Sequence, residues 1–211
     1  MSSLDAAVDF WEGLMGGERP RGYWHTFEKL LKLLRRARAR GTFAGALALT
    51  AHGIERMTKD IDLLVHPEDK AALLRHLSME LTLQEDLDTL VVFRDPETTV
   101  DVDILVPFDS ISLAACSSPV PARVRGRRIR VVGANDLTAM KVIAAVDSPG
   151  AEAKQRADVE ALVRQGRIDV NHVSRLLADE AGADYARYFM ERVRHVQAHP
   201  ARVPPRRRSL R

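Results

Sequence analysis

The chain holds a single cysteine, Cys116, among 211 residues. A lone cysteine excludes an intramolecular disulfide bond and any zinc site built on several cysteines, and it fits a reducing compartment. The sequence also lacks an apolar run of the roughly 18 residues that a membrane-spanning helix needs. Its first residues, MSSLDAAVDFWEGL, predict an amphipathic helix with acidic groups, whereas a leader peptide would be basic. We therefore expect a soluble, cytoplasmic protein with no membrane partner.

Two glycine-rich phosphate-binding motifs are missing as well. Neither G-x-G-x-x-G nor G-x-x-x-x-G-K follows any expected strand, which excludes Rossmann-type dinucleotide binding and P-loop chemistry. A glycosyltransferase with a D-x-D motif is disfavoured, because such enzymes place a nucleotide-sugar domain ahead of the motif. Here the motif begins at Asp60, which leaves too little chain before it.

The positive charge of the chain is unevenly distributed. The formal net charge is +3, but residues 200–211 contain five arginines and no acid, and without those five the balance is −2. A segment rich in proline and arginine cannot bury a core. We therefore expect residues 198–211 to be a disordered basic tail, which either keeps the protein soluble or contacts nucleic acid through its charge.

Four carboxylates accompany two short segments that are typical of strands. The run DIDLLV begins with Asp60 and Asp62, and the run TVDVDIL contains Asp101 and Asp103. Side chains two residues apart on a strand face the same side, about 7 Å from each other. Carboxylates gathered from neighbouring strands would repel each other strongly unless a divalent cation lay among them. The alternative is two solvated strand ends.

A turn of small residues, Ala44-Gly45-Ala46, precedes the first of these runs. It separates a short apolar segment from a helix-like stretch and lies fifteen positions before Asp60. Backbone amides at the start of a helix bind phosphate well. Gly45 and Ala46 are therefore candidates for contacts with a nucleotide.

The order of these features resembles the nucleotidyltransferase superfamily that includes DNA polymerase β. In that superfamily a small-residue turn, a spacer and D-x-D precede a third Asp on a later strand. The sequence is similar in particular to the minimal, AbiEii-toxin-like bacterial branch, which has G-G-x-A, a spacer and R-x-T-x-D-I-D. The matching residues are Gly45, Ala48, Gly53, Arg56, Thr58, Asp60 and Asp62. Ala46 departs from the pattern, because the branch has a second Gly or a Ser there and the added methyl group lies where phosphate would approach.

The resemblance extends over about residues 40–165 and includes Lys141 and Asp158. Lys141 stands among apolar neighbours, and a buried lysine is costly without a partner. A lysine that reaches a triphosphate would have one, and a lysine that extends to the surface would need none. Through the resemblance we expect the first arrangement.

The resemblance implies a fold and a reaction. The fold is α/β (α+β), with a mixed β-sheet, flanking helices and a helical C-terminal region. The reaction is the metal-dependent transfer of a nucleoside monophosphate from an NTP to a hydroxyl of an RNA, a protein or a small molecule. The alternative is a non-catalytic relative that binds a nucleotide or a partner, and the departure at Ala46 keeps this alternative open.

The resemblance also implies site residues and partners. Asp60, Asp62 and Asp103 would be catalytic and would bind two Mg²⁺ ions, which align and neutralise the reacting phosphate. We choose Asp103 over Asp101 because it lies nearer the end of its strand. An antitoxin protein would be a partner if the chain is the toxin of a toxin–antitoxin pair. The residues expected to bind the NTP are Gly45, Ala46, Arg56, Thr58 and Lys141.

Five arginines crowd the segment from Pro121 to Val132, which predicts a hairpin around Gly126. One interpretation is that they bind an RNA acceptor such as tRNA by neutralising its phosphates. The other is that they protect a sheet edge from aggregation. The arginines proposed for the acceptor are Arg123, Arg125, Arg127 and Arg128.

Four regions follow from the order of the expected elements. N-terminal helices occupy residues 1–40, with helices at about 4–15 and at His25–Arg40, and a nucleotidyltransferase-like sheet domain occupies 41–133. A helical C-terminal region occupies 134–197, and its first helix is expected to be capped by Asn135. The basic tail, 198–211, completes the chain.

Overall fold

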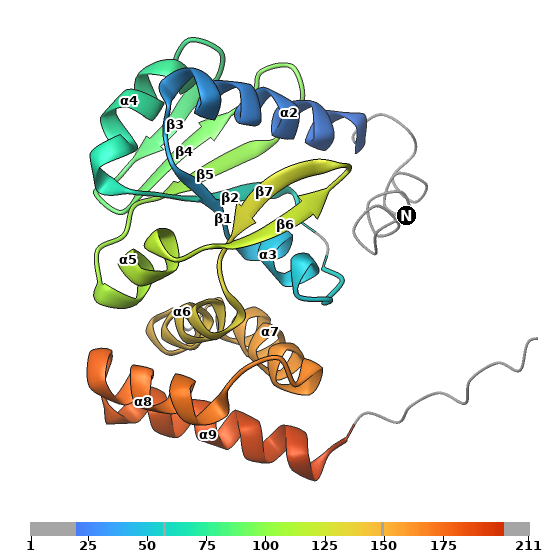
Figure 1. The fold of residues 1–211 in the computed structure, drawn as a ribbon, viewed down its shortest axis with the longest axis vertical. Helices are drawn as coiled ribbons and strands as arrows, with labels where there is room; N and C mark the ends of the chain where they lie inside the picture. The colour runs from blue at the N-terminus through green and yellow to red at the C-terminus, as the bar shows by residue number, and fades with distance from the viewer. Residues whose placement is uncertain (1–19, 57, 149, 201–211) are drawn as a thin grey trace, which may run out of the picture.

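The structure, a computed structural model, describes residues 20–56, 58–148 and 150–200. The helix expected at residues 4–15 and nearly all of the expected tail lie outside the described residues. The described chain forms one seven-stranded sheet with helices on both sides (Figure 1). This arrangement confirms the predicted α/β fold with a mixed sheet.

The strand order across the sheet is β3-β4-β5-β2-β1-β7-β6. The central strands β2 and β5 run parallel, as do β1 and β7, whereas the other neighbours are antiparallel. The sheet is therefore mixed. The strands are β1 (Gly41–Phe43), β2 (Asp60–Val65), β3 (Thr82–Asp86), β4 (Leu90–Arg94), β5 (Asp101–Leu105), β6 (Val120–Val124) and β7 (Arg127–Val131).

The helices divide into those that cover the sheet and those that follow it. Figure 1 shows α2 and α4 along one side, and α6 to α9 stacked beyond α3 and α5 on the other. The helices are α2 (Pro20–Ala37), α3 (Gly45–Ala51), α4 (Pro67–Leu77), α5 (Ser110–Ser117), α6 (Ala134–Asp147), α7 (Glu152–Gln165), α8 (Val170–Glu180) and α9 (Ala183–Ala198).

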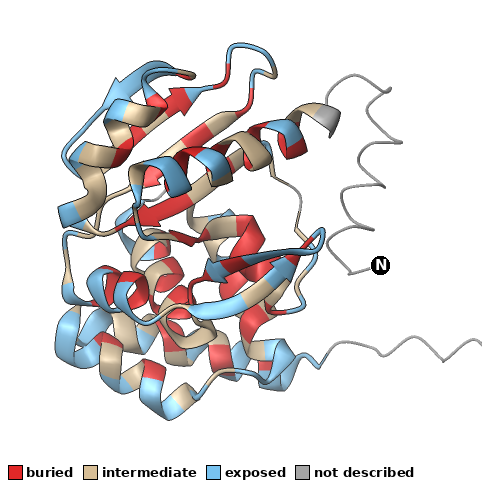
Figure 2. Ribbon diagram, turned by 45° about the horizontal axis from the view of Figure 1, so that its top comes forward, coloured by how far each residue is buried: buried red, intermediate tan, exposed pale blue. Residues whose placement is uncertain are grey.

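Alternation along β2 decides which of its residues enter the core. Ile61 and Leu63 are fully buried, and a Cβ atom added at Gly41 would lie 2.9 Å from side-chain carbons of both Leu63 and Leu34 of α2. These two residues of β2 therefore face α2, and Figure 2 shows the buried residues on the inner side of that helix. Asp60 and Asp62 consequently face the opposite side of the sheet, toward α3.

Two helix starts differ from the prediction. The helix expected from His25 begins at Pro20, because proline is favoured in the first turn of a helix, where its missing N–H costs nothing. The earlier start adds Tyr23 and Trp24 to the buried face of α2. Asn135 does not cap α6, since Gly133 occupies that position, and its side chain instead accepts a hydrogen bond of 2.9 Å from the backbone N–H of Asp169.

None of the helices in the described ranges is both long and apolar enough to cross a membrane.

Candidate active site

The predicted carboxylates meet at the centre of the sheet. β2 and β5 pair so that Asp60 lies opposite Asp101 and Asp62 lies opposite Asp103. Residues opposite each other on parallel strands point to the same face, with backbones about 4.8 Å apart. The register therefore places all four aspartates on one face, as the sequence predicts.

The turn before α3 lies directly against Asp62. The Ala44 N–H donates a hydrogen bond of 3.0 Å to the backbone carbonyl of Asp62. Gly45 has φ +48°, and a Cβ atom there would lie 1.6 Å from Oδ2 of Asp62. Both the positive φ and the close contact require glycine. Ala46 is buried, and Ala44 provides no side-chain cap for the first amides of α3.

Arg56 and Thr58, the first residues of the R-x-T-x-D-I-D segment, contact carboxylates within the protein. The Thr58 hydroxyl donates to Oδ1 and, at 3.0 Å, to the backbone carbonyl of Asp60. Arg56 forms an ion pair with Asp158 of α7. Thr58 thus orients Asp60, while Arg56 ties the loop before β2 to the C-terminal helices.

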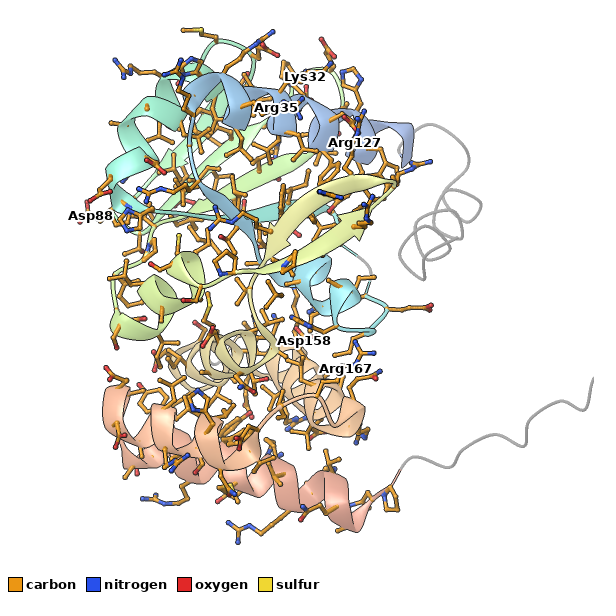
Figure 3. The ribbon with its side chains drawn as sticks, viewed as in Figure 1. Lys32, Arg35, Asp88, Arg127, Asp158 and Arg167 are labelled. Carbon is orange, nitrogen blue, oxygen red and sulfur yellow. The ribbon has the colours of Figure 1, made fainter. Side chains whose placement is uncertain are left out.

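Asp158 also accounts for the burial of Lys141. The Lys141 ammonium lies 2.8 Å from Oδ2 of Asp158 and donates a hydrogen bond of 2.9 Å to Oε1 of Gln155. Lys141 and Asp158 are both buried, so each compensates the charge of the other. Figure 3 shows Asp158 among the side chains between α3 and the C-terminal helices.

Negative charge is poorly compensated on the aspartate face. Burial and then repulsion from the neighbouring Asp60 raise the pKa of Asp62 to about 6, against the opposing effect of Lys141, Lys154 and Arg56. Burial, followed by repulsion from Asp62 and Asp60, raises the pKa of Asp103 to about 7. Both carboxyl groups are therefore costly to ionise without a cation.

Asp101 differs from the other three aspartates because it has a cation of its own. Arg94, opposite it on β4, donates hydrogen bonds of 2.7 and 2.9 Å to the two oxygens of Asp101. This paired geometry neutralises Asp101. Asp103, opposite Val92, has no such partner across the strand.

The donor set fits a hard divalent cation, although the side chains do not converge on one point. Carboxylate oxygens are the ligands that Mg²⁺ takes, and the pKa values of Asp62 and Asp103 are raised by burial and then by repulsion, both of which a cation would offset. Within residues 20–56, 58–148 and 150–200, no three His, Cys, Asp or Glu side chains are gathered closely enough to hold a metal ion. The pairing of β2 with β5 places the aspartates on the same face of the sheet, although their side-chain oxygens are not directed at one point.

Two residues near this face were missed by sequence reasoning. Lys154 is exposed on α7 and lies near enough to oppose the rise in the pKa of Asp62 and of Asp103. Tyr23 is buried, and its hydroxyl has no hydrogen-bond partner among the described residues. Its pKa is raised by burial and then by the charges of Asp62 and Asp60. Lys154 lies one helical turn before Asp158, so the sequence could have indicated that both residues lie on the same side of α7. The burial of Tyr23 could not be predicted in this way, because it depends on where α2 begins.

The arginine-rich segment forms the predicted hairpin, β6–β7, at the edge of the sheet. Its turn is Arg125-Gly126, and both residues have positive φ, +46° and +76°. Two-residue turns of this kind favour Asn or Gly at the first position, so the arginine is held there at a cost of about 1–2 kcal/mol. Arg125 lies over the ring of Trp24, at 5.0 Å, and Arg127 pairs with Glu28 at 2.7 Å.

The fold is similar to that of solved nucleotidyltransferases. ANT(2″)-Ia in complex with adenylyl-2″-tobramycin has a TM-score of 0.55 and 16% identity, over 80% of this chain and 97% of that chain. A solution structure of the antibiotic-resistance factor ANT(2″)-Ia has a TM-score of 0.52 and 17% identity, over 82% and 91%. An antigenic nucleotidyltransferase-like protein from Paracoccidioides brasiliensis has a TM-score of 0.50 and 16% identity, over 81% and 85%.

Comparison with curated proteins gives no match. The family model described as nucleotidyl transferase AbiEii toxin, type IV toxin–antitoxin system, matches residues 30–209, which is most of the chain. The matched range contains all four aspartates, Arg56, Lys141 and Asp158. The chain therefore belongs to the AbiEii family of nucleotidyl transferase toxins.

Proposed function

We propose that this nucleotidyltransferase transfers a nucleoside monophosphate from an NTP to a hydroxyl group of RNA and acts as the toxin of a toxin–antitoxin pair. In the reaction, the acceptor oxygen bonds to the α-phosphorus, the bond from that phosphorus to the β-phosphate oxygen breaks, and pyrophosphate leaves. The acceptor hydroxyl gives up its proton, and Asp103 is the proposed base. Asp103 is chosen over Asp101 for this role because Asp101 is paired with Arg94, whereas Asp103 lies opposite Val92 and has no cation across the strand.

The observation that carries the proposal is the register of β2 with β5. It gathers Asp60, Asp62 and Asp103 on one face while Asp101 is neutralised by Arg94. Bound Mg²⁺ would supply charge neutralisation for the triphosphate. We assign Asp60, Asp62 and Asp103 as its ligands, with Thr58 holding the Asp60 carboxylate in place.

The donor phosphates are assigned to two places beside the aspartates. The first is the turn at Gly45 and Ala46, which has no side-chain cap for its amides. The second is the cation pair Arg56 and Lys141, where a triphosphate would compete with Asp158 for both side chains. A phosphate oxygen can replace a carboxylate oxygen as the partner of these cations without leaving either cation unpaired.

We assign the acceptor to the hairpin face because its arginines are exposed. Arg123, Arg125, Arg127 and Arg128 all lie on the surface of β6–β7, and such a group favours a polyanion. The family description supports an antitoxin partner, since the matching model is of a toxin from a type IV toxin–antitoxin system.

The test is to incubate the protein with Mg²⁺, each labelled NTP in turn, and total cellular RNA together with lysate protein. We expect label from one or more NTPs in RNA, and no label when a chelator removes the metal. The Asp62→Asn variant should give no product, whereas Asp101→Asn should remain active. Label found solely in protein would overturn the RNA acceptor, and full activity of Asp62→Asn would overturn the site.

A further inference from the structure

A cavity of about 510 Å³ lies between the hairpin turn and the first half of α2. Its volume falls within the range of about 300–1,000 Å³ that is usual for small-ligand sites. The lining residues are Trp24, Glu28, Arg125, Gly126 and Arg127. Figure 3 shows Arg127 on the hairpin strand that lies beside α2. The cavity is thus bounded by a helix and a sheet edge that are joined by the Arg127–Glu28 ion pair.

Arg125 lines this cavity and lies over the ring of Trp24. Its guanidinium group lies 5.0 Å from the centre of the Trp24 ring, and the Trp24 ring in turn packs edge-on against Tyr23 and Phe27, with centroids 5.2 and 5.4 Å away. Trp24 is only 6% exposed, so the guanidinium covers the ring and keeps its own outer surface toward solvent. The turn position of Arg125 has a positive φ that Asn or Gly would adopt more easily. An arginine at such an unfavourable backbone position suggests a role beyond the turn.

The polar groups around Arg125 favour an anionic, planar ligand. Glu28 and Arg127 neutralise each other, which leaves the charge of Arg125 as the excess charge among the lining residues. A cationic small molecule would be repelled by Arg125, whereas a nucleobase can stack on a guanidinium plane while its phosphate meets the positive charge.

Tyr23 connects the cavity lining to the electrostatic environment of the aspartates. It packs edge-on against Trp24, and its pKa is raised by burial and then by the charges of Asp62 and Asp60. The donor-phosphate cations, Arg56 and Lys141, are instead held at α7 by Asp158. The cavity is therefore available to the acceptor rather than to the phosphates of the donor.

We propose that Arg125, backed by Trp24, is a stacking platform for one unpaired base of the RNA acceptor. The proposal rests on the RNA acceptor proposed above and names the part of the acceptor that is bound. It predicts a preference for single-stranded RNA, because a base inside a duplex cannot leave its neighbours to stack on the protein without an energetic cost.

The decisive variant is Arg125→Lys, which keeps the charge and the turn conformation but removes the planar group. Binding of a 15-nucleotide single strand of RNA and of the matching duplex would be measured by fluorescence anisotropy, in metal-free buffer so that no transfer occurs. We expect Arg125→Lys to weaken single-strand binding about tenfold and to leave duplex binding unchanged. Arg175→Lys, an exposed substitution on α8, is the matched control and should change neither.

The outcomes separate this proposal from the proposed function. Unchanged single-strand binding by Arg125→Lys would overturn the platform while leaving RNA as the acceptor. An equal loss on single strand and duplex would mean that Arg125 contacts phosphate alone, which also overturns stacking. If the unsubstituted protein bound neither RNA, the RNA acceptor would fail and the platform with it, whereas nucleotidyl transfer itself would still be judged by the labelling assay.

Discussion

Two regions of the sheet contain aspartates in opposite electrostatic situations. At the turn between β4 and β5, Asp95 is completely buried and accepts hydrogen bonds from Thr26 (2.8 Å), Lys29 (2.9 Å) and the backbone N–H of Glu97 (3.1 Å). Burial would raise its pKa, but the hydrogen bonds from Lys29 and Thr26 outweigh burial and lower it. On the aspartate face, the pKa values of Asp62 and Asp103 are raised to about 6 and about 7.

The difference separates a carboxylate that stabilises the fold from the carboxylates that we propose as ligands of a cation. Asp95 joins α2 to the β4–β5 turn, and its charge is matched inside the protein. Asp62 and Asp103 repel Asp60 and each other, which costs stability in the protein alone. Uncompensated charge of this kind is typical of functional sites, and it is the physical reason for assigning the site to β2 and β5.

The largest expected effect is the loss of catalysis in Asp62→Asn. The substitution removes a proposed metal ligand, so turnover should fall by a factor on the order of 10²–10³. Its thermal stability in the metal-free state should be equal to or above that of the unsubstituted protein, because it also removes repulsion. Turnover measured with Mg²⁺ tests the expected loss of catalysis. Thermal unfolding measured with a chelator present tests the expected metal-free stability. Lower metal-free stability would contradict the interpretation of Asp62 as an uncompensated charge.

The reverse pattern is expected for Asp95→Asn. Removing the buried charge leaves Lys29 with the exposed Glu97, at 3.4 Å, as its remaining anionic partner, which should lower the free energy of unfolding by about 3 kcal/mol. Catalysis by the folded fraction should be unchanged. Urea unfolding measures the loss, and Glu85→Gln, a substitution at an exposed position of β3, is the control and should change stability by less than about 0.5 kcal/mol. A loss of turnover without a loss of stability would place Asp95 in the site.

The pH dependence of stability should differ between the two regions. Asp62 and Asp103 have raised pKa values, so the metal-free native state binds more protons than the unfolded state between about pH 4 and 7, and the free energy of unfolding falls as pH rises through this window. Asp95, whose pKa is lowered, contributes stability that is constant here and is lost below about pH 4.

Asp103→Asn should reduce the slope of the free energy of unfolding against pH between pH 4 and 7. The gain in stability at pH 8 should be about 1 kcal/mol, a discounted value because this carboxylate is partly exposed. Urea unfolding of both proteins at several pH values, with a chelator present, measures the slope and the gain. A slope identical to that of the unsubstituted protein would mean that Asp103 is not repelled by Asp62 and Asp60.

Local patterns were sufficient to predict the aspartate face. Asp60 with Asp62, and Asp101 with Asp103, share faces because alternation along a strand is a local property. The Gly45 turn was predicted for its amides, but its contact with Asp62 crosses from one element to another and required the structure. The start of α2 was placed too late because Tyr23 and Trp24 precede the regular leucine pattern of that helix.

The partners of charged residues were harder to predict than their positions. The sequence left Lys141 with two interpretations, a triphosphate or the surface, and the structure adds a third because Asp158 accepts from both Lys141 and Arg56. Arg56 and Asp158 are 102 positions apart, and no local pattern relates such distant residues. The pairing of Arg94 with Asp101 could have been predicted, because a short connection between two antiparallel strands places the residues at its two ends opposite each other.

The smallest effect is expected at Asp101, two residues from Asp103 on the same face of β5. Its charge is already matched by Arg94, and its side chain is 32% exposed. Among the causes that raise the pKa of Asp103, Asp101 follows burial, Asp62 and Asp60. Asp101→Asn should lower the free energy of unfolding by at most about 1 kcal/mol, as for other exposed ion pairs. Turnover should stay within about threefold of the unsubstituted enzyme, since a change of that size corresponds to well under 1 kcal/mol in the barrier. Asp103→Asn should be much less active in the same Mg²⁺-dependent assay. The reverse ranking would transfer the third carboxylate to Asp101 and would mean that Arg94 releases it when the substrate binds.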